Sequence, residues 1–268
     1  SKPMTQLPPK GAERSLMKKI AFFDAKPYDK EWFDRVNTTY DIQYLETKLT
    51  PATARLAAGS DAVVAFVNDN LNAEVIDILY DLGIRVIAMR SAGYSNVDFK
   101  EAYGKINIVR VPAYSPYAIA EHAMGLLLTV NRKLNRAYNR TRDFNFSIAG
   151  LTGVDLHAKT AGVIGTGKIG RAFIDICKGF GMRVIAYDAY PAKDTDIEYV
   201  SLDTLLTQSD VISLHCPLNE QTMHMLDAAA FEKMKKGVFI VNTSRGALID
   251  TEALLDAQRQ FAPPVLLG

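Results

Sequence analysis

The chain has 268 residues, of which 48% are hydrophobic and 23% are charged. This composition is ordinary for a globular protein and excludes a largely disordered, collagen-like or coiled-coil chain. Lys and Arg total 31 against 30 for Asp and Glu, so the formal net charge of +1 gives no overall field that would attract nucleic acid or an acidic membrane. The length fits one large or two modest domains, and every apolar run is far shorter than the roughly 18 residues of a membrane span.

The segment 1–16 (SKPMTQLPPKGAERSL) is polar, contains prolines and shows no apolar period. We expect it to be a disordered extension, and because it lacks the apolar core of a secretory signal we expect a cytoplasmic protein. Cys177 and Cys216 are far apart and fit two buried thiols in a reducing compartment. The histidines lack the spacing of a metal site, so no metal is predicted; they are His122, His157, His215 and His224.

From Lys18 onward, short apolar runs alternate with helical patterns, which predicts βαβ units and a parallel sheet. The strand-like runs cover 20–25, 42–46, 62–67, 85–90 and 107–111, and the helical patterns cover 29–36, 53–58, 73–83 and 97–103.

A long amphipathic segment, 115–143, follows. We expect it to open as a helix, with Ser115 as its cap and Pro116 in its first turn. Its length favours a helix that bridges two domains or packs against a second subunit, although a core helix of one domain fits the periodicity equally well. We place the domain boundary in this region, with a substrate domain over 17–113 and a cofactor domain over 114–268.

A second alternating series begins after Gly150. Strands are expected over 160–165, 183–188, 198–200, 211–216 and 237–243, and helices over 168–178, 202–206, 228–234 and 251–258. The predicted fold class is therefore α/β, with two doubly wound parallel sheets.

The motif GTGKIG follows a predicted strand and opens a predicted helix, which is the context of a dinucleotide-binding loop. The first glycine permits a tight turn, the second lets the backbone approach a pyrophosphate, and the third allows close packing of helix on strand. The predicted cofactor-binding residues of this loop are Gly165, Thr166, Gly167, Lys168, Ile169 and Gly170.

Asp188 ends the next predicted strand, where a carboxylate accepts hydrogen bonds from the adenosine ribose. A carboxylate there repels a 2′-phosphate, and no arginine follows it immediately, so NAD is expected rather than NADP. The alternative is that Asp188 is a solvated turn residue at the strand end.

Ligands of open parallel sheets bind beyond the carboxyl ends of the strands. Arg245 follows such a strand and can bind a carboxylate through two hydrogen bonds, or alternatively form a salt bridge between domains. In the first domain, Gly93 and its neighbours form either a small anion-binding nest or a plain turn. The residues expected to face the cofactor are His215, Cys216, Pro217, Thr243, Ser244 and Arg245.

Five strings in this order resemble the NAD-dependent D-2-hydroxyacid dehydrogenases: RSAGYSNVD, VPAYSPYAIAEHAMGLLLTVNRKL, TAGVIGTGKIG, DVISLHCPL and MKKGVFIVNTSRGALIDTEALLDA. The passage NRAYNRTRDFNFSIAGLTG is most similar to the fermentative D-lactate dehydrogenases within that family. The resemblance covers about 18–258. It implies a flavodoxin-like substrate domain, a Rossmann-type NAD domain, a cleft between them, and homodimers or larger assemblies built through the cofactor domains.

The resemblance also implies roles for single residues. Arg245 matches the catalytic, substrate-binding arginine, Ala92 and Gly93 match the backbone that holds the substrate carboxylate, and Tyr114 matches a pocket tyrosine. In the same way, His215 and Pro217 match the adenine and ribose side and Thr243 the nicotinamide side. The implied reaction is hydride transfer from NADH to pyruvate, giving D-lactate; the alternatives are another 2-hydroxy acid, or a non-catalytic NAD(H)-binding module.

The family takes its proton from a histidine paired with a glutamate, both downstream of the arginine segment. Here the sequence after Ala257 reads QRQFAPPVLLG, so neither residue has a match. We interpret this as a truncation or a reading-frame change, and we expect turnover to fall by about 10² to 10⁴ without the general acid. Residues 265–267 are expected to supply a short replacement strand at the edge of the second sheet, although the preceding prolines limit its hydrogen bonds.

Overall fold

The computed structural model describes residues 17–193, 195–261 and 265–267, so the expected extension over 1–16 lies outside the described residues. It consists of two compact units, with the first ending at Tyr114 and the second beginning at Ser115. Within the described ranges, no helix is both long enough and apolar enough to span a bilayer.

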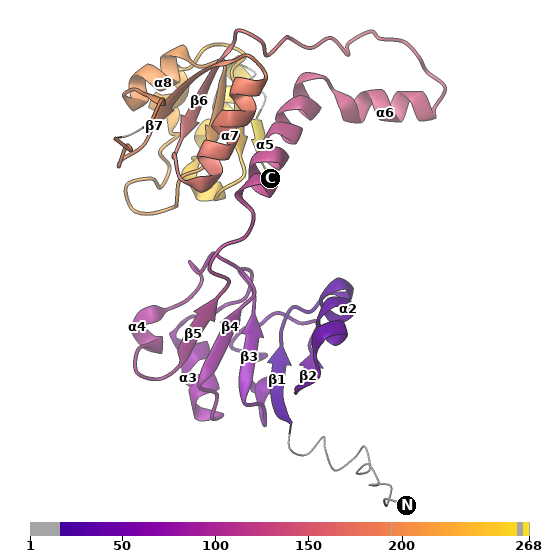
Figure 1. The fold of residues 1–268 in the computed structure, drawn as a ribbon, viewed down its shortest axis with the longest axis vertical. Helices are drawn as coiled ribbons and strands as arrows, with labels where there is room; N and C mark the ends of the chain where they lie inside the picture. The colour runs from indigo at the N-terminus through magenta and orange to yellow at the C-terminus, as the bar shows by residue number, and fades with distance from the viewer. Residues whose placement is uncertain (1–16, 194, 262–264, 268) are drawn as a thin grey trace, which may run out of the picture. The chain divides into compact units, whose positions relative to one another are not determined.

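The first unit is built on a five-stranded parallel sheet in the order β2-β1-β3-β4-β5 (Figure 1). This is the doubly wound order of flavodoxin-like sheets, in which ligands bind beyond the carboxyl ends of the strands. The strands are β1 (Lys18–Phe22), β2 (Tyr40–Tyr44), β3 (Ala62–Ala65), β4 (Val86–Met89) and β5 (Asn107–Arg110).

Helices of the first unit pack apolar faces against this sheet. The side chains of Val75, Ile76 and Leu79 are fully buried in one cluster with Val63 and Ile87 of the sheet. Side-chain caps fix two helix starts, since Asn72 accepts from the N–H of Val75 and Asp98 from that of Glu101. The helical elements are α2 (Pro27–Val36), η1 (Ala54–Ala57), α3 (Ala73–Asp81) and α4 (Phe99–Ala102).

The second unit contains a six-stranded parallel sheet in the order β11-β10-β9-β6-β7-β8. The chain runs from β6 outward to β8, then returns beside β6 and runs outward to β11, so β6 and β9 flank the point where the strand order reverses. The expected replacement strand is confirmed, because β11 pairs in parallel with β10. The strands are β6 (Thr160–Ile164), β7 (Arg183–Tyr187), β8 (Glu198–Tyr199), β9 (Val211–Leu214), β10 (Phe239–Asn242) and β11 (Val265–Leu267).

Helices α5 and α7 lie side by side on the second sheet (Figure 1). Ala120, Ala123 and Leu127 of α5 share one buried cluster with Phe173 and Cys177 of α7. The helical elements of this unit are α5 (Pro116–Asn131), α6 (Leu134–Arg142), α7 (Lys168–Gly179), α8 (Leu202–Gln208), α9 (Ala228–Lys233), η2 (Gly246–Leu248) and α10 (Thr251–Phe261).

The expectation of one long helix over 115–143 is wrong, because the helix stops at Asn131 and a second one starts at Leu134. Lys133 between them has φ +52°, a left-handed conformation that no α-helix continues through. Two contacts hold the break: the buried Asn131 side chain exchanges two hydrogen bonds with the backbone of Val154, and Lys133 Nζ donates to the carbonyl of Thr152. At the other end Ser115 occupies the cap position, but its side chain makes no capping hydrogen bond.

Candidate functional site

The turn between β6 and α7 is formed by glycines that leave no room for side chains. Gly165 has φ +94°, and a Cβ there would lie 2.7 Å from the backbone nitrogen of Cys216. A Cβ on Gly170 would overlap the carbonyl oxygen of Gly165. One glycine therefore makes the turn and the other lets α7 pack closely on the end of β6. Gly167 has open space around its Cβ position, so a ligand has room to approach its backbone.

The first residues of α7 present N–H groups that the described part of the chain does not use. Those of Gly167, Lys168 and Ile169 donate to no acceptor in the described part of the chain. They form the amino end of a 12-residue helix, where the helix dipole adds partial positive charge. The side chains of Lys168 and Ile169 are exposed and half-buried, respectively. This end of the helix suits an anionic group such as a pyrophosphate.

Asp188 follows β7 and is tied to the glycine-rich loop. Its Oδ2 accepts from both the N–H and the hydroxyl of Thr166, at 2.7 Å and 2.8 Å, and its Oδ1 accepts from the N–H of Tyr190 at 2.8 Å. Partial burial alone would raise the pKa of Asp188, but the hydrogen bonds from Thr166 and Tyr190 outweigh it and hold this pKa below its ordinary value. The carboxylate is therefore ionised and fixed in orientation. The N–H of Thr166 already donates to Asp188, so this N–H is not available to a ligand.

Sequence reasoning missed Tyr199 at this site. The tyrosine lies on the edge strand β8, and its hydroxyl is 2.9 Å from the Thr166 hydroxyl. The only signal in the sequence was the short strand-like run EYV, which does not say that β8 pairs with β7 or that the tyrosine reaches the loop.

His215 and Cys216 follow β9 and pack against the glycine-rich loop. His215 Nε2 lies 2.9 Å from the Ser213 hydroxyl, whereas Nδ1 is buried and has no hydrogen-bond partner among the described residues. Burial lowers the pKa of His215 to about 4, so the ring is neutral at ordinary pH. Burial also raises the pKa of the Cys216 thiol to about 11, which leaves it unreactive. Pro217 is exposed beyond them.

Thr243, Ser244 and Arg245 follow β10 at the same edge of the sheet. Thr243 Oγ1 is buried without a hydrogen-bond partner in the described residues, while the Ser244 hydroxyl donates to the carbonyl of Leu214. The Arg245 side chain is exposed, and within the described ranges it forms no ion pair. Its charge is available to an anionic ligand.

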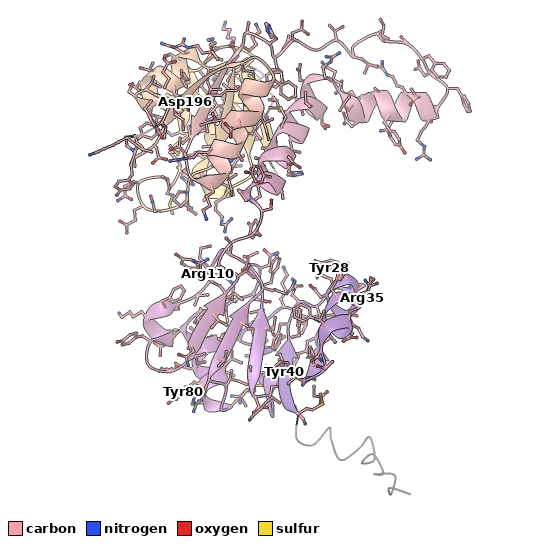
Figure 2. The ribbon with its side chains drawn as sticks, in the orientation of Figure 1. Tyr28, Arg35, Tyr40, Tyr80, Arg110 and Asp196 are labelled. Carbon is pink, nitrogen blue, oxygen red and sulfur yellow. The ribbon has the colours of Figure 1, made fainter. Side chains whose placement is uncertain are left out.

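The candidate residues of the first unit lie in the loop after β4. The N–H groups of Ala92 and Gly93 donate to no acceptor among the residues described. The carbonyl of Ala92, by contrast, is occupied: it accepts from Arg110, which Figure 2 labels at the end of β5, at 3.1 Å. This loop therefore offers backbone donors, as an anion-binding nest does. Tyr114, at the end of the unit, is 57% exposed.

A half-buried arginine, Arg90, which sequence reasoning did not single out, makes the contacts that hold the start of this loop. Arg90 donates to the carbonyl of Asp24 at 2.6 Å and approaches the carboxylate of Asp29 to 3.3 Å, with its guanidinium 4.4 Å from the Phe66 ring centroid. Because Arg90 immediately precedes the loop, these contacts set where the N–H groups of Gly93 and its neighbour are presented.

The second unit fits a bound dinucleotide on three observations. The amino end of α7 offers free N–H donors, Asp188 offers an ionised carboxylate, and two buried polar atoms, His215 Nδ1 and Thr243 Oγ1, lack partners within the described residues. Buried polar atoms are normally satisfied, so a ligand that reaches them removes a cost of folding. In the part of the chain that the structure describes, no three acidic, histidine or cysteine side chains gather as a metal site would require.

The chain matches known proteins along most of its length. Residues 124–261 match the family described as D-isomer specific 2-hydroxyacid dehydrogenase, NAD binding domain. The D-lactate dehydrogenase of Escherichia coli K12 is 51% identical over 245 residues, covering 89% of this chain and 74% of that protein.

Solved structures agree with this match. The apo-structure of the Escherichia coli D-lactate dehydrogenase has a TM-score of 0.85 at 49% identity, covering 93% of this chain and 81% of that one. The D-lactate dehydrogenase of Aquifex aeolicus, solved with NAD and lactic acid, has a TM-score of 0.81 at 31% identity, covering 92% and 76%. The predicted family, fold class and coenzyme are thereby confirmed. The chain belongs to the D-isomer specific 2-hydroxyacid dehydrogenases, a family of NAD-dependent oxidoreductases.

Proposed function

We propose that this protein is a D-lactate dehydrogenase, which reduces pyruvate to D-lactate with NADH. The observation that carries the proposal is the 51% identity over 245 residues with a D-lactate dehydrogenase. The site geometry supports it: among the described residues, Arg245 forms no ion pair and the N–H groups of the loop at Gly93 have no acceptor, so both suit a carboxylate.

In this proposal the second unit holds the coenzyme. The free N–H groups at the start of α7 bind the pyrophosphate, and Asp188 accepts from the adenosine ribose. Thr243 lines the nicotinamide side, and His215 and Pro217 line the adenosine side. When bound, NADH supplies the hydride that adds to the C2 carbon of the 2-keto acid.

The substrate contacts are assigned to each unit separately. Arg245 binds the carboxylate of the 2-keto acid and polarises its carbonyl, which orients the acid for reaction. In the first unit, the N–H groups of Ala92 and Gly93 bind a carboxylate and Tyr114 contacts the substrate. These roles make the first unit the substrate domain and the second unit the NAD domain, with the boundary one residue after the 113/114 boundary expected from the sequence.

We assign the proton of the reduction to none of the four histidines. A ring whose pKa is about 4, as at His215, holds no proton to donate near neutral pH. His224 is 53% exposed and 4.0 Å from Asp250, in a turn before α9. His122 and His157 are exposed and stand outside the motif that carries the proton donor in the family.

The test is coenzyme oxidation by the complete gene product with a panel of 2-keto acids. The highest kcat/KM is expected with pyruvate, and the product is expected to be D-lactate. A higher value with hydroxypyruvate or a branched 2-keto acid would identify another member of the family. NADH binding without turnover on any acid would favour a non-catalytic NAD(H)-binding module.

Substitution of Arg245 separates substrate binding from coenzyme binding. Because this side chain is exposed and forms no ion pair in the described residues, Arg245→Gln is expected to leave folding unchanged and to change the Kd for NADH much less than it changes the reaction with pyruvate. Its kcat/KM for pyruvate is expected to fall by at least about 100-fold, as loss of a charged transition-state donor does. An unchanged kcat/KM in steady-state assays would refute the substrate role.

We also propose that the active protein is a homodimer formed through an arm of the second unit, which consists of α6 and the segment 143–150 that follows it. Figure 1 shows α6 projecting away from the sheet of that unit and the chain after it returning to the sheet. Helix α6 buries no residue, and apolar side chains of the arm are between 50% and 84% exposed, namely Leu134, Tyr138, Phe144, Phe146 and Ile148. So large an exposed apolar surface is typical of a protein interface. Light scattering is expected to give a dimer mass, and Ile148→Asp is expected to lower it toward that of a monomer.

A further inference from the structure

A chain of hydrogen bonds joins the edge of the second sheet to Asp188. The N–H of Ala192 donates to the Tyr199 hydroxyl at 3.4 Å, that hydroxyl lies 2.9 Å from the Thr166 hydroxyl, and the Thr166 hydroxyl lies 2.8 Å from Asp188 Oδ2. Pairing of β8 with β7 places Tyr199 opposite Ala186, close to the strand end from which Asp188 projects.

The direction of this chain follows from the chemistry of its members. The pKa of Asp188 lies below its ordinary value, so the carboxylate is ionised and accepts only. The single hydroxyl proton of Thr166 must therefore point to Asp188, and the Thr166 oxygen must accept the proton of Tyr199. The Tyr199 oxygen is then free to accept the N–H of Ala192. Every group is satisfied in this one arrangement, from backbone N–H to carboxylate.

These hydrogen bonds fix the orientation of the Asp188 carboxylate. Oδ2 accepts two hydrogen bonds from Thr166, which is only 4% exposed, and Oδ1 accepts one from the N–H of Tyr190. A fixed Asp188 keeps its remaining lone pairs in one orientation, and under the proposed function these are the lone pairs that accept from the adenosine ribose. It also cannot rotate away from a 2′-phosphate, whose negative charge it repels.

We propose that Thr166 and Tyr199 are positioning residues for coenzyme selection: acting through Asp188, they make the site prefer NADH over NADPH. The proposal rests on the proposed function in one respect, the meeting of Asp188 with the adenosine ribose. Neither side chain needs to touch the coenzyme for the effect to appear.

The test measures binding rather than turnover. Fluorescence titration gives the Kd for NADH and for NADPH, and the ratio of the two is the readout. Thr166→Val removes one hydroxyl bond and keeps the backbone N–H bond to Asp188, and Tyr199→Phe removes only the distal hydroxyl. Each is expected to lower the preference for NADH by about threefold to tenfold, the effect of one hydrogen bond. Thr166→Ser keeps the hydroxyl and is expected to restore the preference.

Two further variants separate positioning from a general structural effect. In the Thr166→Val background, Tyr199→Phe is expected to change the ratio no further, because the tyrosine acts only through the threonine. Tyr103→Phe is the matched control, since that tyrosine is 90% exposed in the other unit and its hydroxyl makes no hydrogen bond in the described residues. It is expected to leave both Kd values unchanged.

The outcomes distinguish failure of the positioning role of Thr166 and Tyr199 from failure of the proposed function. If the unaltered protein binds neither coenzyme, the proposed function fails. If it binds NADH and both single variants keep the original Kd ratio, the positioning role is overturned while NAD binding stands. Should Thr166→Val fail to fold by circular dichroism, Tyr199→Phe alone decides, because it deletes one oxygen from a short edge strand.

Discussion

Gly170 lies in the first turn of α7 and Gly179 is its last residue, and the space around the two positions differs. A Cβ at Gly170 would overlap the carbonyl oxygen of Gly165, whereas a Cβ at Gly179 would meet nothing within 4 Å. Gly170→Ala is therefore expected to cost about 1–3 kcal/mol of unfolding free energy and to weaken NADH binding by displacing the loop. Gly179→Ala is expected to stabilise by about 0.5 kcal/mol. Urea unfolding measures the stability of both variants, and titration with NADH measures their affinity. Equal changes in unfolding free energy for the two variants would contradict the packing argument.

A second prediction at the residue scale concerns acid stability. Burial beside Phe173 lowers the pKa of His215 from 6.5 to about 4 in the folded chain. Between these values the unfolded chain binds the proton and the folded chain does not, so stability falls as the pH drops through this window. The loss from His215 is expected to be about 2 kcal/mol between about pH 7 and about pH 5. His215→Gln lacks this proton, so its urea midpoint is expected to change less over the same range; an equal change would contradict the assignment.

Local sequence patterns predicted the strands and most of the helices, but they did not predict contacts between residues far apart in the sequence. The glycine-rich turn is visible in the sequence because Gly165 and Gly170 satisfy local sterics. The partnership of Thr166 with Tyr199 is not, because it depends on β8 pairing with β7 across a long loop. The break in the helix at Lys133 is hidden for the same reason, since it follows from contacts with Thr152 and Val154 on the returning chain.

At the scale of elements, Asn131 at the end of α5 binds the segment that returns from the arm to the sheet. Its side chain both donates to the carbonyl of Val154 and accepts from its N–H, at 2.8 Å and 2.9 Å, and it is 3% exposed. Asn131→Ala leaves both backbone groups without that partner and is expected to cost about 1–3 kcal/mol. Asn139→Ala, on the exposed face of α6, is the control and is expected to be neutral or slightly stabilising.

The same substitution tests the link between the arm and assembly. If the returning chain holds the arm in place, Asn131→Ala also shifts the monomer–dimer equilibrium toward monomer in sedimentation experiments. A stable monomer–dimer ratio together with the expected loss of stability would show that the arm is positioned by other contacts.

At the scale of the whole molecule, the sequence provides a separate reporter for each unit. The single tryptophan, Trp32, is in the first unit, and both cysteines, Cys177 and Cys216, are in the second. Tryptophan fluorescence therefore follows the unit with the Gly93 loop, and the reaction of thiols with an added reagent follows the unit with the dinucleotide loop. Cys177 is fully buried, so it reacts only when the second unit opens.

NAD⁺ is expected to raise the urea concentration at which the thiols become reactive and to leave the Trp32 fluorescence transition unchanged. A ligand that binds only the folded second unit stabilises it by about 2.7 kcal/mol at a concentration of 100 times its Kd. The urea concentration at which Cys177 becomes reactive is then expected to rise, while the midpoint of the Trp32 transition stays where it was. NAD⁺ suits this experiment because, unlike NADH, it does not absorb in the range of tryptophan emission. Equal shifts of both midpoints would mean that the two units unfold as one cooperative structure, and an unchanged thiol signal would mean that the glycine-rich loop does not bind the coenzyme.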